Sequence, residues 1–467
     1  MRRGSRYYVR IRVPLTLTAT VGRTHIWRSL RTSDRQEAAK RARIVVGEIQ
    51  RSFGDVPEPV RPHAPAGRSI GLTLEQAFDR FLADPARTRS VKTESHYANL
   101  RVVTRGLWGQ DRPLALVGRD DCRRLLDVLR VLPPNVAKRH RGKPFARVVE
   151  LAESGRTGQV INPATVNGYL SKLRAVLNYA QNEGWIDRNP ARGLRVVDPV
   201  RARDKRKPFS SDQLRLIFDA PIFRGCQDDG DGYAVPGPAR PRRARFWIPL
   251  LALFAGLRMN EACQLEPDDV VLIDGIWCLS ISTASATAPS KKLKTDASER
   301  LIPIHPALEA IGFVDFAADI RAARRARLFG ELNAGSSGYL SDPYSKWFRR
   351  FLAKAGAAEP KTCFHSFRHS FRDALRDAGV RHDVGLALGG WASADASDPE
   401  AAYGRGFSAT VLHEAISRIS YPVCLDHLIS EGGPRPAAGE AGDRSSLDTS
   451  AGIGPIVNQL CEPVLRG

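Results

Sequence analysis

Residues 246–262 read FWIPLLALFAGLRMNEA, the longest apolar run of the chain followed at once by a charged junction. The apolar part, Phe246 to Leu257, is hydrophobic all round, which is typical of a helix that is buried on every side. A new helix begins at the junction, where Arg258 can point into a cleft while Glu261, one turn later, holds its guanidinium. Because Arg-x-x-Glu pairs are also common surface salt bridges, the interpretation depends on the rest of the chain.

A hairpin with a lysine near its turn follows this stretch. Trp277 to Ser282 reads as a strand, and Arg300 to Ile304 reads as the strand that returns from it. Lys294 lies in or near the turn, where a flexible ammonium can serve as a mobile acid. The alternative is an exposed turn lysine without chemistry, and Lys291 and Lys292 compete for the same role.

The next piece combines a histidine and an arginine. His365 and Arg368 are three residues apart, so on a helix they share one face. Histidine exchanges a proton near neutral pH and arginine is permanently charged, so the pair suits a phosphodiester. His369 follows directly and is a supporting candidate.

Two aromatic residues complete the set. Trp391 follows Leu388-Gly389-Gly390, and its indole N–H can only donate, which suits a non-bridging phosphate oxygen. Tyr403 stands in the polar stretch Ala401–Gly406, which is not typical of a core. An acidic segment, 395–400, separates the two residues.

The charge of the chain predicts a polyanionic partner. Lys and Arg number 71 against 50 Asp and Glu, a formal charge of +21, and such a surface attracts nucleic acid through counterion release. Aromatic residues are only 7%, fewer than we expect for an RNA-binding sheet with stacking rings. No apolar run approaches the roughly twenty residues of a membrane helix, and the N-terminus lacks an apolar signal, so we expect a cytoplasmic protein. The seven cysteines lack metal-binding spacing, so we expect no bound metal.

The N-terminal residues 1–56 form a small basic module in this interpretation. Residues 6–13 and 25–30 read as strands, and residues 35–53 read as a helix capped by Ser33-Asp34. This module is either an arm that contacts DNA or a solvated basic face. Residues 57–71 are rich in Pro and Gly and are typical of a linker.

The rest of the chain divides into a helical domain, a basic linker and a larger domain. Residues 72–196 carry helical apolar stripes, interrupted by a basic insert of low periodicity at 133–160. The linker spans 197–208, and the residues with candidate chemistry fall in 209–425, which also contains a Gly/Pro/Arg loop at 225–243. We expect the tail, 426–467, to be disordered. The basic residues that we expect to contact DNA are Arg10, Arg12, Arg28, Arg174, Arg203, Lys205, Arg206 and Lys207.

The order Arg258, Lys294, His365 with Arg368, Trp391 and Tyr403 resembles the tyrosine recombinase (phage integrase) family. Residues 1–56 are similar to the N-terminal module of prophage integrases, and residues 72–196 resemble the core-binding domain of the family. Most relatives carry His where Trp391 stands, and the segment between Trp391 and Tyr403 is longer than usual. The resemblance implies a multidomain fold, mainly α with small β-sheets, that ends in an α+β catalytic domain.

The resemblance also implies a chemistry. Tyr403 would attack the phosphodiester to form a 3′-phosphotyrosine, and Lys294 would protonate the departing 5′-hydroxyl. Arg258 and Arg368 would hold the phosphate, His365 would act as the base and Trp391 as a donor, with Glu261 and His369 in support. It implies no cofactor, ATP or metal. The implied partners are double-stranded DNA, three further copies of the chain in a homotetramer, and possible DNA-bending or directionality factors during integration or excision of a mobile element.

Two alternative functions and one structural question remain open from the sequence. A type IB topoisomerase uses similar residues to relax supercoils, although the N-terminal module and the helical domain argue against it. A catalytically inactive DNA-binding regulator would keep the basic surface and lose one of the five pieces. The apolar face of Thr410 to Ile419 could dock on a neighbouring subunit, as in the family, or pack on its own domain.

Overall fold

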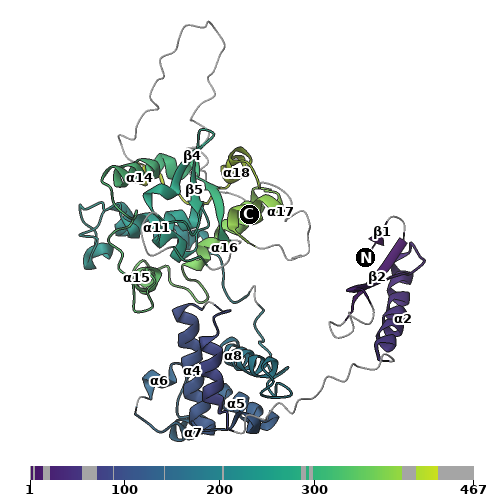
Figure 1. Ribbon diagram of the computed structural model, residues 1–467. Coiled ribbons are helices and arrows are strands. Elements are labelled where there is room, and N and C mark those ends of the chain that lie inside the picture. The colour runs from purple at the N-terminus through teal and green to yellow at the C-terminus, as the bar shows by residue number, and fades with distance from the viewer. Residues whose placement is uncertain are drawn as a thin grey trace. The chain divides into compact units, whose positions relative to one another are not determined.

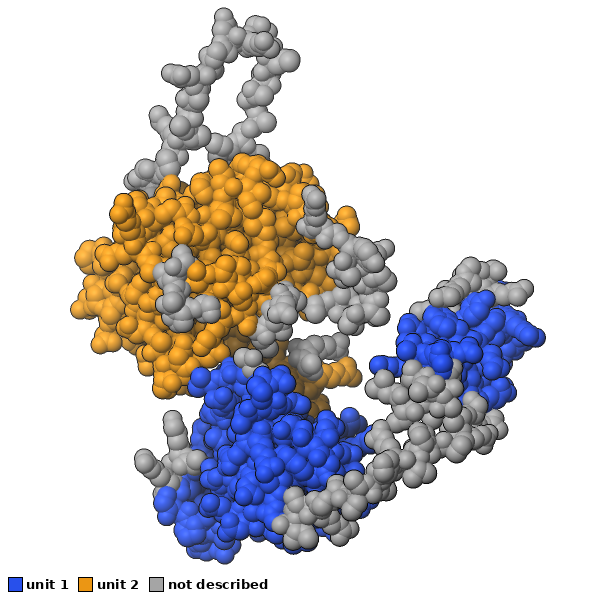
Figure 2. Space-filling model, viewed as in Figure 1, with its two compact units in different colours: residues 1–197 blue, residues 198–467 orange. Residues whose placement is uncertain are grey.

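The computed structural model describes residues 2–3, 6–13, 22–54, 71–87, 89–140, 142–201, 204–285, 291–293, 298–391 and 406–429. Lys294, Tyr403 and Arg203, three candidates from the sequence, lie outside these residues, as does 430–467 of the expected tail. The chain divides into two compact units, residues 1–197 and 198–467 (Figure 2).

The N-terminal module is a three-stranded antiparallel sheet with one helix. The strands β1 (Arg2–Arg3), β2 (Arg6–Arg12) and β3 (His25–Ser29) lie in chain order. Helix α2 (Arg35–Gly54) packs against β2 (Figure 1) and begins where Asp34 Oδ1 accepts the backbone N–H of Glu37 at 2.7 Å. The predicted strands and helix are therefore present.

The remainder of the first unit is helical. Its helices are α3 (Leu74–Ala83), α4 (Val91–Trp108), α5 (Arg119–Val131), α6 (Val136–Arg139), α7 (Phe145–Glu153) and α8 (Pro163–Asn182), with a 3-10 turn, η2 (Leu114–Leu116). Their apolar stripes meet in one core that includes Phe78, Leu100, Leu125 and Leu173. Asn162 caps α8 by accepting the backbone N–H of Thr165 at 2.8 Å.

The segment 133–160, a basic insert of low periodicity in the sequence, has helical structure. It contains α6 and α7, and Val148, Val149 and Ala152 of α7 are buried in the core of the unit. Gly106 of α4 makes room for α7, because a Cβ at that position would lie 2.2 Å from Cγ of Phe145. Two short helices present too few turns for a periodic pattern to stand out in the sequence.

The second unit places helices around a small antiparallel sheet. The sheet order is β4 (Val270–Ile273), β5 (Ile276–Ile281) and β6 (Arg300–Pro303), with Leu279 opposite Ile302. The helical elements are α9 (Ser211–Phe218), α10 (Pro221–Arg224), η4 (Asp231–Ala234), α11 (Ala244–Phe254), α12 (Met259–Cys263), η5 (Pro267–Asp269), α13 (Pro306–Ile311), α14 (Phe313–Ala322), α15 (Ser341–Lys354), α16 (His365–Asp377), α17 (His382–Gly389), α18 (Ala409–Ile416) and η8 (Asp426–Leu428). Helices with two small sheets agree with the expected fold class.

Helix α11 is the centre of this unit. All but one of its eleven residues are buried, as the apolar run Phe246 to Leu257 predicted. It packs against α16 (Figure 1), so the buried helix directly supports the helix that carries His365 and Arg368. The helix ends at Phe254, and the chain turns at Gly256 with φ +60° before α12 begins.

The C-terminal helix α18 packs on its own unit, against β6 and β5. Leu412, Ala415 and Ile416 are buried there, which is the second of the two arrangements considered for this apolar face. Beyond it, the hydroxyl of Tyr421 donates to the carbonyl of Leu253 at 2.7 Å. Residues 426–428, placed in the tail by composition, form η8, where Leu428 is buried because it meets the same core.

Candidate active site

Arg258 stands at the first position before α12, where the chain leaves the buried helix. Its Nη1 donates to Oε1 of Glu261 at 2.5 Å and to Oγ of Ser298 at 3.0 Å. The other carboxylate oxygen of Glu261 accepts the backbone N–H of Arg258 at 3.0 Å, so Glu261 holds both the backbone and the side chain. The side chain of Arg258 keeps 24% exposure, whereas that of Glu261 keeps 3%. Arg258 can therefore reach a ligand while its carboxylate partner cannot.

A second arginine shares Glu261 and was not singled out from the sequence. Arg300 at the start of β6 donates from Nη2 to Oε2 of Glu261 at 2.9 Å, and its side chain is 4% exposed. Burial alone would raise the pKa of Glu261, but Arg300 and Arg258 outweigh it and leave that pKa lowered, so the carboxylate is ionised at neutral pH. The alternation with buried Ile302 and Ile304 was the available signal, because it places Arg300 on the inward face of the strand.

Arg368 is buried on α16 and holds two turns of the chain together. Its Nη1 donates to the carbonyl of Gly256 at 2.6 Å, and its Nη2 donates to the carbonyl of Gly389. Burial, then the neighbouring Arg300 and Arg258, lower the pKa of Arg368 to about 9, which keeps it charged at neutral pH. The expected Arg258 and Arg368 are thus brought together from segments far apart in the chain.

Both glycines of Gly389-Gly390-Trp391 are required by the local geometry. Helix α17 ends at Gly389 and is capped by Gly390, whose φ of +56° is left-handed. The chain then turns back, so that the backbone N–H of Trp391 donates to the carbonyl of Leu386 at 3.0 Å. A Cβ on Gly389 would lie 2.1 Å from the Trp391 ring. The guanidinium of Arg368 lies 4.8 Å from the ring centroid. The indole N–H of Trp391 has no acceptor among the described residues and is available to a ligand.

The cluster has more positive than negative charge. Arg300, Arg258 and Arg372 all act on Arg368 with like charge, and Glu261 opposes them. A carboxylate in low-dielectric surroundings can balance about one guanidinium, so the remaining positive charge favours an anion. Planar guanidiniums with free N–H groups suit a tetrahedral oxyanion such as phosphate.

His365 lies one turn before Arg368 on α16, as the spacing predicted. Burial, then the charge of Arg206, lower the pKa of His365 to about 4, with smaller effects from His369 and the two site arginines. The imidazole is therefore neutral at pH 7 and can accept a proton. The ring of His369 lies 5.2 Å away, and burial followed by Arg206 also lowers its pKa. The linker residue Arg206 thus acts on both histidines.

The structure separates the three lysines that competed in the hairpin. Lys291 is buried and its Nζ lies 2.5 Å from Oδ1 of Asp269 and 3.4 Å from Oε2 of Glu266. Nζ of Lys292 lies 5.1 Å from the ring centroid of Tyr339. Both ammonium groups have partners within the unit, and Lys294 lies outside the described residues.

The residues expected to contact DNA differ in their surroundings. Arg12 and Arg28 are exposed, and Arg10 is exposed above the ring of Trp27, 5.3 Å from its centroid. Arg174 is half-buried and donates to the carbonyl of Leu194 at 2.8 Å, so part of its guanidinium is used within the unit. In the linker, Lys207 is exposed, whereas Nζ of Lys205 pairs with Oδ2 of Asp198 at 2.6 Å.

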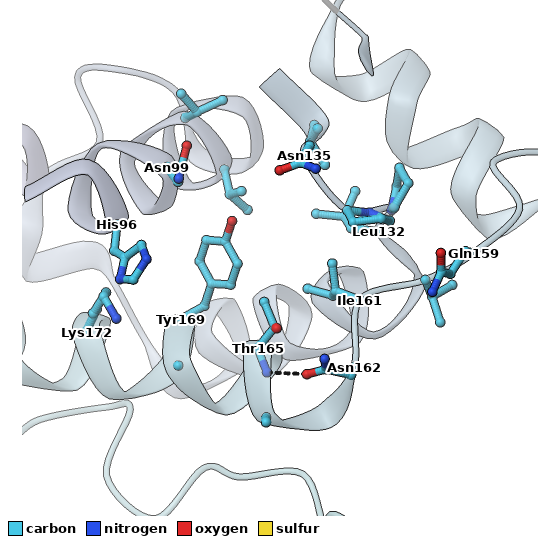
Figure 3. A pocket seen from close by; sticks show the side chains of 18 of the residues that line it. His96, Asn99, Leu132, Asn135, Gln159, Ile161, Asn162, Thr165, Tyr169 and Lys172 are labelled. Carbon is cyan, nitrogen blue, oxygen red and sulfur yellow. Dashed lines mark hydrogen bonds between the residues drawn. The ribbon is translucent and has the colours of Figure 1, made fainter. Parts of the chain in front are cut away.

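A groove of about 840 Å³ opens between α4 and α8 of the first unit, walled by both ends of the segment 133–160. In Figure 3, Tyr169 rises from α8 with its hydroxyl toward the middle of the groove, and His96 and Lys172 lie together on one side. Burial, then Lys172 and Lys92, lower the pKa of His96. Among the described residues that line the groove none is acidic, and several are amides or hydroxyls, a composition that favours a polyanion with hydrogen-bonding groups.

The described residues contain no group of three His, Cys, Asp or Glu side chains placed to bind a metal ion. Within the same described residues, no helix is both long enough and apolar enough to cross a membrane.

Comparison with known proteins gives one sequence match and several structural ones. Residues 1–57 match a family described as a domain of unknown function, DUF6538, and no curated protein matches the sequence. The chain is similar to the Tn1549 transposon integrase in complex with transposon right end DNA, with 17% identity, a TM-score of 0.46, and coverage of 69% of this chain and 92% of that chain. It is similar to a lambda integrase tetramer bound to a Holliday junction, with 17% identity, a TM-score of 0.45, and coverage of 85% and 98%. It is also similar to the integrase from mycobacterium phage Brujita, with 17% identity, a TM-score of 0.31, and coverage of 76% of this chain and 98% of that chain.

Proposed function

We propose that this chain is a tyrosine recombinase that cleaves and rejoins DNA through a covalent phosphotyrosine at Tyr403. The observation that carries the proposal is the cluster of Arg258, Arg300 and Arg368 around the single carboxylate Glu261, beside a neutral His365. The cluster holds charge that matches a phosphodiester and a base that matches a tyrosine nucleophile.

In this mechanism Arg258 and Arg368 bind the non-bridging oxygens and stabilise the charge that grows on them in the transition state. The Tyr403 hydroxyl gives its proton to His365 as its oxygen bonds to phosphorus. The bond from phosphorus to the 5′-oxygen breaks, and Lys294 protonates that oxygen. A 5′-hydroxyl of a second strand reverses these steps, so the phosphotyrosine conserves the bond energy and the mechanism calls for no ATP.

The DNA would be held by both units. The groove with Lys172 and His96 supports backbone contact by the first unit, and the exposed Arg12, Arg28 and Lys207 support further phosphate contacts. Strand exchange needs four cleavages, so we propose a homotetramer on DNA, acting in integration or excision of a mobile element.

Covalent trapping tests the proposal. The protein is incubated with a pool of nicked suicide duplexes, denatured, and the DNA-linked peptide is identified by mass spectrometry. We expect a 3′-phosphoryl adduct on Tyr403 that is lost in Tyr403→Phe and kept in the matched control Tyr339→Phe. Salt-sensitive binding of DNA without any adduct would favour the inactive regulator. Relaxation of supercoiled plasmid without exchange between duplexes would favour a type IB topoisomerase.

A further inference from the structure

Arg300 is the arginine of the site whose three guanidinium nitrogens all have a partner within the unit. Its Nε donates to the carbonyl of Leu388 at 3.0 Å, its Nη1 to the carbonyl of Ser298 at 2.8 Å, and its Nη2 to Oε2 of Glu261 at 2.9 Å. Its side chain is 4% exposed, and its Nε is occupied, whereas the partners of Arg368 are at Nη1 and Nη2.

These partners connect Arg300 to both phosphate-binding candidates. Glu261 also takes the Nη1 of Arg258, so Arg300 and Arg258 hold the two oxygens of one carboxylate. Leu388 is followed by Gly389 and Gly390, whose carbonyls bind the other two arginines. The carbonyl of Gly389 accepts from Arg368, and that of Gly390 accepts from Nη2 of Arg258 at 3.4 Å. One planar guanidinium therefore ties the strand β6, the helix α12 and the end of α17 together.

We propose that Arg300 is a positioning residue, which orients Arg258 and Arg368 toward the scissile phosphate without touching it. This inference rests on the proposed function. Without Arg300, Glu261 keeps only Arg258 as a guanidinium partner, so it neutralises the charge that Arg258 needs for phosphate. The carbonyl of Leu388 also loses its donor, and the turn that presents Trp391 is no longer fixed.

Lysine cannot replace this geometry, because its ammonium is one point charge and cannot reach three partners in the plane of a fork. Arg300→Lys therefore preserves the positive charge and tests the fork alone. Arg300→Met removes both. Arg242→Met is the matched control, since Arg242 lies in the same unit and donates only to the carbonyls of Ile311 and Leu428, at 2.5 Å each.

The experiment compares two substrates that share the cleavage site mapped by covalent trapping. One carries the normal scissile phosphodiester, and the other carries an uncharged methylphosphonate there, which needs less help from guanidiniums. We expect Arg300→Met to slow adduct formation on the phosphodiester about 100-fold, the scale for loss of one oriented donor, and on the methylphosphonate less than about tenfold. Arg300→Lys should show the same contrast at smaller size, and Arg242→Met should show none at equal folded fraction.

Equal losses on the two substrates would overturn the inference, because a purely structural arginine slows both alike. If Arg300→Met does not fold, the same comparison is made with Arg300→Lys. Absence of any adduct from the unmodified chain would instead refute the proposed function itself.

Discussion

Replacing Glu261 with glutamine tests whether the arginine cluster is held together by one buried charge. Glu261→Gln keeps the shape of the side chain and removes the carboxylate that pairs with Arg258 and Arg300. Breaking a buried ion pair by removal of one partner costs about 3–5 kcal/mol, because the remaining charge stays buried without compensation. We expect a loss of that size in the free energy of unfolding at pH 7, measured by urea denaturation.

The same substitution should make the site more dependent on an anion. With Glu261 gone, Arg258 and Arg300 lose the carboxylate that pairs with them, so added phosphate should restore stability to Glu261→Gln more than to the unmodified chain. The assay is thermal unfolding in increasing inorganic phosphate, at constant ionic strength set with chloride. The exposed Glu359→Gln is the control, and it should change neither stability nor the response to phosphate.

Two results would refute this reasoning. If Glu261→Gln leaves the unfolding free energy unchanged, Glu261 does not compensate the arginines in solution. If phosphate stabilises both proteins by the same amount, the cluster is not the anion site. The pH dependence of stability gives a further test. Because its pKa is lowered in the folded chain, Glu261 stabilises the fold above its ordinary pKa, and this stabilisation is lost as pH falls through the folded pKa. Glu261→Gln should lack this loss.

Three further predictions follow from other parts of the structure. Burial lowers the pKa of His305 to about 4, so the unfolded chain binds more protons than the folded one below pH 6.5. This histidine should therefore lower the free energy of unfolding by about 3 kcal/mol between pH 6.5 and pH 4. His305→Asn should flatten this pH dependence in urea titrations, and an unchanged dependence would contradict the assignment. Gly389→Ala should displace the Trp391 ring and slow adduct formation about 100-fold while DNA binding in gel shifts is retained; a normal rate would show that the ring position is unimportant. Lys172→Ala should weaken DNA binding and reduce the salt slope of the affinity by about 1, whereas Lys143→Ala, outside the groove, should not, and equal effects would remove the groove from the DNA interface.

The sequence by itself determined the elements and most of the candidate residues of the second unit. The apolar run at 246–257 predicted the buried helix that became the centre of the core. The spacing of His365 and Arg368 placed both on one face of α16, and the spacing of Arg258 and Glu261 predicted their ion pair. These relations lie within one or two helical turns, and local periodicity reports on contacts at that range.

The tertiary structure decided which distant charges meet. Glu261 and Arg300 are 39 residues apart, and nothing in the spacing indicates that they share an ion pair until β6 is placed beside α12. The same holds for Lys291, which competed with Lys294 as the candidate acid in the sequence. In the structure its ammonium is buried in ion pairs with Asp269 and Glu266. A buried charge is costly unless it is paired, and its partner depends on which chain segments the core brings together. Sequence patterns indicate the face on which a side chain lies, and packing alone decides what that face meets.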